Sequence, residues 1–141
     1  MVMLDSYLFF DGNCADAMRF YEKVTGGKIT AMMKYSESPV PHQCPVNSED
    51  RIMHASLQLD GRNLMASDSP AGQHKPMGGF ALSLWYDSEP PAQKAFDALA
   101  EGGTVMMPMG PTFWAKTFGM LTDKFGTSWM VSGGMVQPPP K

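Results

Sequence analysis

Cysteine, positive charge and long apolar runs are all scarce in this sequence. Two cysteines, Cys14 and Cys44, fall far short of the disulfide density of small secreted domains, so we expect reduced thiols. Eleven Lys and Arg residues against 14 Asp and Glu residues give a net charge of −3, which denies the chain the basic field that nucleic-acid binding needs. No run reaches the ~18 apolar residues of a membrane span, and Asp5 interrupts the N-terminal segment where a signal peptide would be apolar. We therefore expect a soluble, cytoplasmic protein without a nucleic-acid or membrane partner.

One part of the chain occurs twice. Residues 8–29 align without a gap on residues 84–105 at an offset of 76, and aromatic, acidic and glycine positions keep their chemical type. Further on, residues 54–66 align on residues 119–131 at an offset of 65. Each copy is typical of a strand, a helix and three further strands. The sequence therefore predicts two βαβββ modules that together make one compact α+β fold.

Each predicted helix carries start and stop signals. Asn13 is the expected cap of a helix over residues 14–24, and Ser88 is the expected cap of the helix in the second copy. Both helices end at a Gly-Gly pair, which suits a left-handed stop. Cys14 falls in the first turn, where the helix dipole favours a reactive thiolate, or it is an ordinary cysteine at a helix start.

Composition sets the expected boundaries. The first module covers residues 1–66 and contains a long irregular loop over residues 36–50, rich in proline and polar residues. Residues 67–79 form a linker, residues 80–132 the second module, and residues 133–141 a frayed tail that ends in three prolines and a lysine. The loop is either functional or a tolerated surface insertion.

Three segments carry a resemblance to a known family. Tyr7–Tyr21, His54–Asp68 and Thr112–Trp129 are similar to the PhnB-like (YjdN-like) branch of the vicinal oxygen chelate superfamily, which includes glyoxalase I, extradiol dioxygenases and bleomycin-resistance proteins. The resemblance implies two modules whose curved, mostly antiparallel sheets form a cleft, usually completed by dimerisation. It implies a homodimer but no particular reaction, because PhnB-like proteins have no assigned chemistry.

Metal-dependent members of the superfamily hold a divalent ion with four His, Glu or Gln side chains. The resemblance places these four positions, within about one residue, at Ser6 and Leu82 on the first strands and at Met65 and Met130 on the last strands. Hydroxyl, alkyl and thioether groups are poor ligands for such ions, and a shift by one residue adds only Asp5. We therefore expect neither the inherited metal site nor another cofactor.

A polar site built on His54 is the alternative. His54 begins a strand and Asp68 ends the same hairpin, so both can approach the mouth of the cleft, with His42, Cys44 or His74 as further members. A His–Asp pair can serve as a general base. Equally, His54 is a half-buried strand residue with one hydrogen bond, and Asp68 caps a helix or a turn. The capping role fits Asp68 better, and His54 is the best catalytic candidate.

Soft apolar and aromatic residues are abundant. The chain has 14 methionines, and several aromatic residues gather between positions 113 and 129. Such side chains suit a pocket for a flat or amphipathic small molecule, and they suit core filling or a dimer interface equally well. The predicted ligand-binding residues are Phe9, His54, Met65, Asp68, Phe113, Trp114 and Trp129.

Two functions from different classes follow. The first is a small-molecule binding protein that lacks the superfamily metal site. The second is a lyase, isomerase or dioxygenase, with or without metal at a His54-centred site, that acts on an oxygen-rich or phosphonate-related compound. Some relatives are named 3-demethylubiquinone methyltransferases, but the common methyltransferase fold has a glycine-rich turn between strand and helix, whereas these glycine pairs follow helices.

Overall fold

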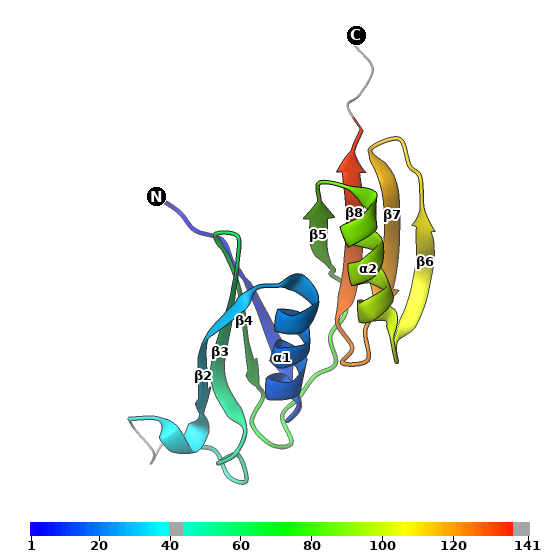
Figure 1. Ribbon diagram of the computed structural model, residues 1–141. Coiled ribbons are helices and arrows are strands. Elements are labelled where there is room, and N and C mark those ends of the chain that lie inside the picture. Colours follow the sequence, from blue (N-terminus) through cyan, green and yellow to red (C-terminus); the bar gives the residue numbers. More distant parts are fainter. Residues whose placement is uncertain (40–43, 137–141) are drawn as a thin grey trace. The chain divides into compact units, whose positions relative to one another are not determined.

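The computed structural model describes residues 1–39 and 44–136 and divides into two units, unit 1 (Met1–Lys75) and unit 2 (Pro76–Lys141) (Figure 1). Unit 1 contains β1 (Ser6–Phe10), α1 (Cys14–Thr25), β2 (Lys28–Lys34), the short 3-10 helix η1 (Tyr35–Glu37), β3 (Ile52–Leu59) and β4 (Arg62–Asp68). Unit 2 contains β5 (Leu82–Tyr86), α2 (Glu89–Ala100), β6 (Thr104–Gly110), β7 (Ala115–Thr122) and β8 (Ser128–Met135).

Both units have the same topology. The strand order is β1-β4-β3-β2 in unit 1 and β5-β8-β7-β6 in unit 2. The outer pairs β1–β4 and β5–β8 are parallel, because a helix connects the first strand to the rest of its module, and the other pairs are antiparallel hairpins. The predicted α+β fold with two βαβββ modules is confirmed.

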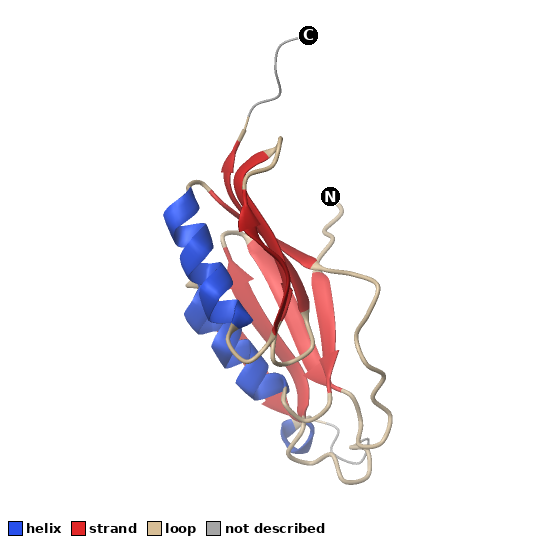
Figure 2. Ribbon diagram, turned by 90° about the vertical axis from the view of Figure 1, so that its right-hand side faces the viewer, coloured by secondary structure: helices blue, strands red, loops and turns tan. Residues whose placement is uncertain are grey.

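One helix lies against one face of each sheet (Figures 1 and 2). In unit 1 the core between helix and sheet contains Leu8 and Phe10 from β1, Tyr21 from α1 and Leu57 from β3. Side chains alternate along a strand, so Tyr7 and Phe9, which are exposed, lie on the opposite face of β1. We call the face of each sheet that no helix covers its open face.

The observed strand ends differ from the predicted boundaries. β4 continues to Asp68, two residues past the predicted end of the first module. β8 continues to Met135, so the frayed tail predicted from residue 133 is wrong for residues 133–135. The reason is pairing, since Gly133 lies opposite Thr117 and Met135 lies opposite Ala115 on β7. Residues 137–141 and His42 lie outside the described residues.

Neither predicted helix cap forms a side-chain capping bond. A capping side chain accepts from the second or third amide of a helix, and in α2 those positions are Pro90 and Pro91, which carry no N–H for Ser88 to bind. Asn13 instead accepts the backbone N–H of Asp11, and another group caps α1.

The predicted glycine stops are confirmed in both units. Gly26 ends α1 with φ 77° and donates to the Glu22 carbonyl oxygen, and Gly102 takes φ 76° after α2. The second glycine of each pair serves close packing, because a Cβ at Gly27 would lie 2.8 Å from the Gln58 carbonyl oxygen. At Gly103 a Cβ would collide with the carbonyl oxygen of Thr122.

Helices α1 and α2 have 12 residues each. Within residues 1–39 and 44–136, no helix has the length and apolar character that crossing a membrane requires.

Candidate functional site

The open face of unit 1 carries a continuous group of aromatic, thioether and polar side chains. On β1, Tyr7 is 38% exposed and Phe9 is 55% exposed. Strand register places Met65 of β4 beside Tyr7, and Ser56 of β3 beside Met65. His54 is two residues before Ser56 on β3, so its side chain lies on the same face. Register places His54 opposite the exposed Met33 of β2.

A hydrogen bond joins Tyr7 and His54 across this face. The Tyr7 hydroxyl lies 3.1 Å from His54 Nδ1, and the two rings are 5.8 Å apart. Tyr7 is on β1 and His54 is on β3, so the contact spans the intervening strand β4. The Tyr7 ring also contacts the Phe9 ring at 5.2 Å. Sequence reasoning proposed His54 but missed Tyr7, although Tyr7 shares the alternating pattern of the predicted ligand residue Phe9.

Strands β1 to β4 place no carboxylate on the open face of unit 1. Strands β1 to β4 contain a single acidic residue, Asp68, at the end of β4. Asp68 is 1% exposed, so its carboxylate is not available to this face. The His–Asp pair considered from the sequence is therefore not formed, and the partner of His54 is a tyrosine.

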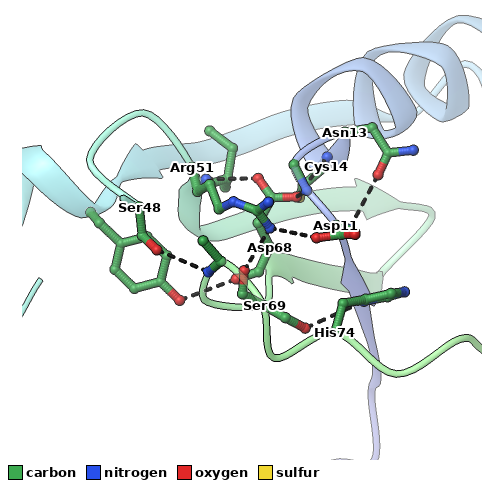
Figure 3. A network of polar contacts seen from close by, with 12 residues as sticks. Asp11, Asn13, Cys14, Ser48, Arg51, Asp68, Ser69 and His74 are labelled. Carbon is green, nitrogen blue, oxygen red and sulfur yellow. Dashed lines mark hydrogen bonds and ion pairs between the residues drawn. The ribbon is translucent and has the colours of Figure 1, made fainter. Parts of the chain in front are cut away.

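Asp68 instead caps α1 from the far end of the module. Its Oδ1 accepts the backbone N–H groups of Gly12 at 2.8 Å and Cys14 at 3.0 Å, and its Oδ2 accepts that of Ile52 at 2.8 Å (Figure 3). A carboxylate at a helix N-terminus satisfies free amides and complements the helix dipole. The capping role preferred from the sequence is the observed one, and the three internal bonds remove Asp68 from the ligand-binding candidates.

A polar network surrounds this cap. Arg51 Nη1 donates to Asp11 Oδ1 at 2.8 Å and to the Ser69 carbonyl oxygen at 2.9 Å, and the Tyr35 hydroxyl donates to the Asp68 carbonyl oxygen at 3.1 Å (Figure 3). The hydrogen bond and charge of Arg51 lower the pKa of Asp11. Burial raises the pKa of Tyr35, and neighbouring Tyr7 adds to the effect. The network fixes the segments that follow β1 and β4 and precede β3.

The two cysteines lie in different environments. Cys14 is fully buried, and burial followed by the nearby charge of Asp68 raises the pKa of its thiol to about 12. The thiolate considered for the helix start is therefore excluded, because burial outweighs the helix dipole. Cys44 is partly exposed and its thiol donates to the Pro45 carbonyl oxygen at 3.5 Å. His74 lies 3.5 Å from the Ser69 hydroxyl, beside the capping network.

The open face of unit 2 has a similar apolar character. Trp85 of β5 is 50% exposed. Register aligns Ser83 of β5 with Met130 of β8, then with Met120 of β7 and the exposed Met107 of β6. This face therefore presents an indole and three thioethers.

The three predicted aromatic residues of unit 2 lie in different environments. Phe113 is exposed and meets the partly buried Trp114 edge-on at 4.7 Å, and Trp114 meets Phe118 at 5.2 Å. Trp129 is 2% exposed on the α2 side of the sheet, and its indole N–H donates to Asp123 Oδ2 at 2.8 Å. Trp129 is thus a core residue, whereas Phe113 and Trp114 remain ligand-binding predictions together with Phe9, His54 and Met65.

The pleat of the first strands shifts the inferred metal positions by one residue. Ser6 and Leu82 have the same orientation as the core residues of their strands, so the open-face positions beside Met65 and Met130 are Tyr7 and Ser83. No imidazole or carboxylate occupies these four positions, and no three His, Cys, Asp or Glu side chains converge anywhere in the described parts of the chain. The donor set therefore does not fit the divalent ion of metal-dependent relatives.

Comparison with known proteins assigns the chain to a family. It is 34% identical to Protein YjdN of Escherichia coli (strain K12), over 96% of this chain and 97% of YjdN. Among solved structures, protein PA1353 from Pseudomonas aeruginosa has a TM-score of 0.87 and 44% identity, covering 95% of this chain and 98% of that one. A PhnB protein from Bacillus cereus, provisionally named a 3-demethylubiquinone-9 3-methyltransferase, has a TM-score of 0.76 and 27% identity, covering 93% of this chain and 98% of that one. Residues 3–131 match the family profile, and the chain therefore belongs to the Glyoxalase/Bleomycin resistance protein/Dioxygenase superfamily.

Proposed function

We propose that this chain binds a flat, largely apolar small molecule on the open faces of its sheets, and that it does so without a divalent metal. One observation carries the proposal: aromatic and thioether side chains are exposed on the face of each sheet that no helix covers. They are Tyr7, Phe9 and Met33 in unit 1 and Trp85 and Met107 in unit 2.

The chemistry of these faces supports small-molecule binding. Ligand sites are typically apolar and aromatic surfaces with a few convergent polar groups. Aromatic rings offer flat contact area, and flexible thioethers adapt to irregular ligands. In unit 1 the polar groups are the Tyr7–His54 pair and the Ser56 hydroxyl.

Titration with N-phenyl-1-naphthylamine, an uncharged probe whose fluorescence rises outside water, tests the proposal. Removing one exposed aromatic ring loses about 1.5–3 kcal/mol of apolar burial, so Phe9→Ser or Trp85→Ser should weaken binding about tenfold or more. Val46→Ser is the matched control, because Val46 is an exposed apolar side chain in the loop before β3. Absence of saturable binding, or equal losses in all three variants, would contradict the proposal.

The metal-free part of the proposal rests on the four open-face positions Tyr7, Met65, Ser83 and Met130. Elemental analysis of protein purified without an affinity tag or chelator should find no divalent metal in stoichiometric amount. Stoichiometric metal that is lost in His54→Ala would contradict this part and favour a metal centre at His54.

An enzyme is the second candidate, and the Tyr7–His54 hydrogen bond favours it. A phenol and an imidazole 3.1 Å apart can exchange a proton with a bound ligand. Incubation of candidate oxygen-rich compounds with the protein, followed by mass spectrometry, should then reveal a product that His54→Ala does not form. Ligands recovered unchanged after binding would support the binding function alone.

The strand pairing of this chain does not support the methyltransferase name that one relative carries. Each sheet has one parallel strand pair among the described residues, whereas the common class of these enzymes uses a doubly wound parallel sheet. We propose that this chain has a different function. Specific, saturable binding of S-adenosylmethionine would overturn that proposal.

We also propose a homodimer. The edge strand β6 exposes three consecutive apolar side chains, Val105, Met106 and Met107. An exposed apolar edge strand favours pairing with another chain. A monomer mass in light scattering at micromolar concentration would refute the dimer.

A cytoplasmic location is proposed on separate grounds. Both cysteines in the described residues are free thiols, which fits a reducing compartment. Recovery of the native protein in a periplasmic or secreted fraction would contradict this location.

A further inference from the structure

We propose that the Tyr7–His54 pair anchors an acidic oxygen of the ligand, so that the ligand class is a flat aromatic anion such as an aryl carboxylate or sulfonate. This inference rests on the proposed binding function and adds a charge preference to it. The site lies on the open face of unit 1, with Phe9 and Met65 as its apolar surroundings.

The pair keeps an unused hydrogen-bond donor in either arrangement of its protons. If the Tyr7 hydroxyl donates to His54 Nδ1, the neutral imidazole carries its hydrogen on Nε2. If Nδ1–H donates to the Tyr7 oxygen, the phenol hydrogen is free instead. Within the described residues, the Tyr7 hydroxyl and the His54 ring form a hydrogen bond with each other and with no other group. The spare donor is therefore available to an oxygen of a bound ligand.

The charged side chains of strands β1 to β4 favour an anionic ligand. Asp68, the single carboxylate of β1 to β4, already accepts three backbone N–H groups away from this face. The charged side chains of β2 are two lysines, Lys28 and Lys34, at its two ends. No carboxylate competes for His54 within the sheet, so a ligand carboxylate or sulfonate would form a charge-assisted hydrogen bond, which is stronger than a neutral one.

The apolar neighbours define the rest of the ligand. The Tyr7 and Phe9 rings are 5.2 Å apart with their planes 39° apart, and Met33 lies opposite His54. A flat ring resting on these side chains excludes water from the anchored oxygen, and a lower local dielectric strengthens the hydrogen bond. The structure thus combines one polar anchor with an aromatic and thioether surface.

Two dyes that differ by one group test the inference. N-phenyl-1-naphthylamine and 1-anilinonaphthalene-8-sulfonate share a ring system, and only the second carries an anionic sulfonate. We expect the wild-type protein to bind the sulfonate about tenfold more tightly than the neutral dye. His54→Ala should bring the ratio of the two dissociation constants close to one. Tyr7→Phe keeps the ring and should lower the ratio without weakening the neutral dye.

His74→Ala is the matched control, since the contact of this histidine is with Ser69, whereas Tyr7 bonds His54. Thermal unfolding of each variant shows that dye binding does not come from partial unfolding. If neither dye binds, the proposed function fails. If both bind wild-type protein equally, or if His54→Ala and Tyr7→Phe keep the wild-type ratio, the anchor is overturned while the binding function stands.

Discussion

Replacing Asp68 tests the structural account of unit 1 most sharply. Asp68→Ala leaves three backbone N–H groups without their acceptor, the buried ones of Cys14 and Ile52 and the part-buried one of Gly12. Each buried donor without a partner costs about 1–3 kcal/mol. Water that enters the vacated space recovers part of this cost, so we expect a loss of about 4 kcal/mol in the free energy of unfolding. That is a large share of the about 5–15 kcal/mol that stabilises a typical domain.

Asp68→Asn separates the hydrogen bonds from the volume of the side chain. The amide keeps one acceptor oxygen for the α1 amides at Oδ1 but places N–H donors against the Ile52 N–H. We expect an intermediate loss of about 2 kcal/mol. Urea unfolding, followed by circular dichroism, measures the free energy of unfolding of both variants. The slope of this free energy against urea concentration should be the same as in the wild type.

Asp97→Ala is the control, because Asp97 is exposed on α2 and accepts a hydrogen bond from the Gln93 side chain. Its loss should stay below about 0.5 kcal/mol. An Asp68→Ala protein within about 1 kcal/mol of wild type would refute the capping role, since even one unsatisfied buried donor costs that much.

Three further predictions concern the thiols, the exposed ion pair and the dimer. In Cys44→Ser protein the buried Cys14, with its thiol pKa raised to about 12, should resist iodoacetamide at pH 8 until urea is added, and labelling at the rate of a free thiol would contradict its burial. Arg51 lowers the pKa of Asp11, so this pair stabilises the fold above the ordinary pKa of Asp11, and the stabilisation is lost as pH falls through the lowered value. An NMR titration should find the Asp11 pKa below its usual 3.8 in wild type and closer to it in Arg51→Gln, and an equal pKa in both proteins would exclude the contact. If the proposed dimer forms through β6, Met106→Lys should convert it to a monomer in light scattering, because a lysine on an edge strand opposes pairing. A dimer that persists in this variant would place the interface elsewhere.

The topology of both units could be predicted from the sequence because it follows from local patterns repeated along the chain. Strand alternation, the Gly-Gly helix stops and the two offsets together specify a βαβββ module without knowledge of any distant contact. Strand ends were less predictable. Glycine is typical of loops and tails, so Gly133 was predicted to begin the tail. It continues β8 because it pairs with Thr117, which lies 16 residues earlier in the chain.

The candidate site was predicted only in part, because its decisive contacts join distant residues. Asp68 caps a helix that begins 54 residues earlier, and no local motif marks a cap supplied from such a distance. Tyr7 and His54 are 47 residues apart and meet across a third strand. A shift of one residue along a strand moves a side chain to the opposite face of the sheet. The metal-ligand position inferred from the sequence was Ser6, whereas the open-face residue at this place is Tyr7.

We propose above that this chain binds a flat small molecule on its open sheet faces without a metal ion. Titration with N-phenyl-1-naphthylamine, before and after dialysis against EDTA and then with added Mg²⁺ or Zn²⁺, tests it most directly. We expect saturable binding with the same dissociation constant under all of these conditions. Binding that vanishes after EDTA and returns only with the metal would contradict it.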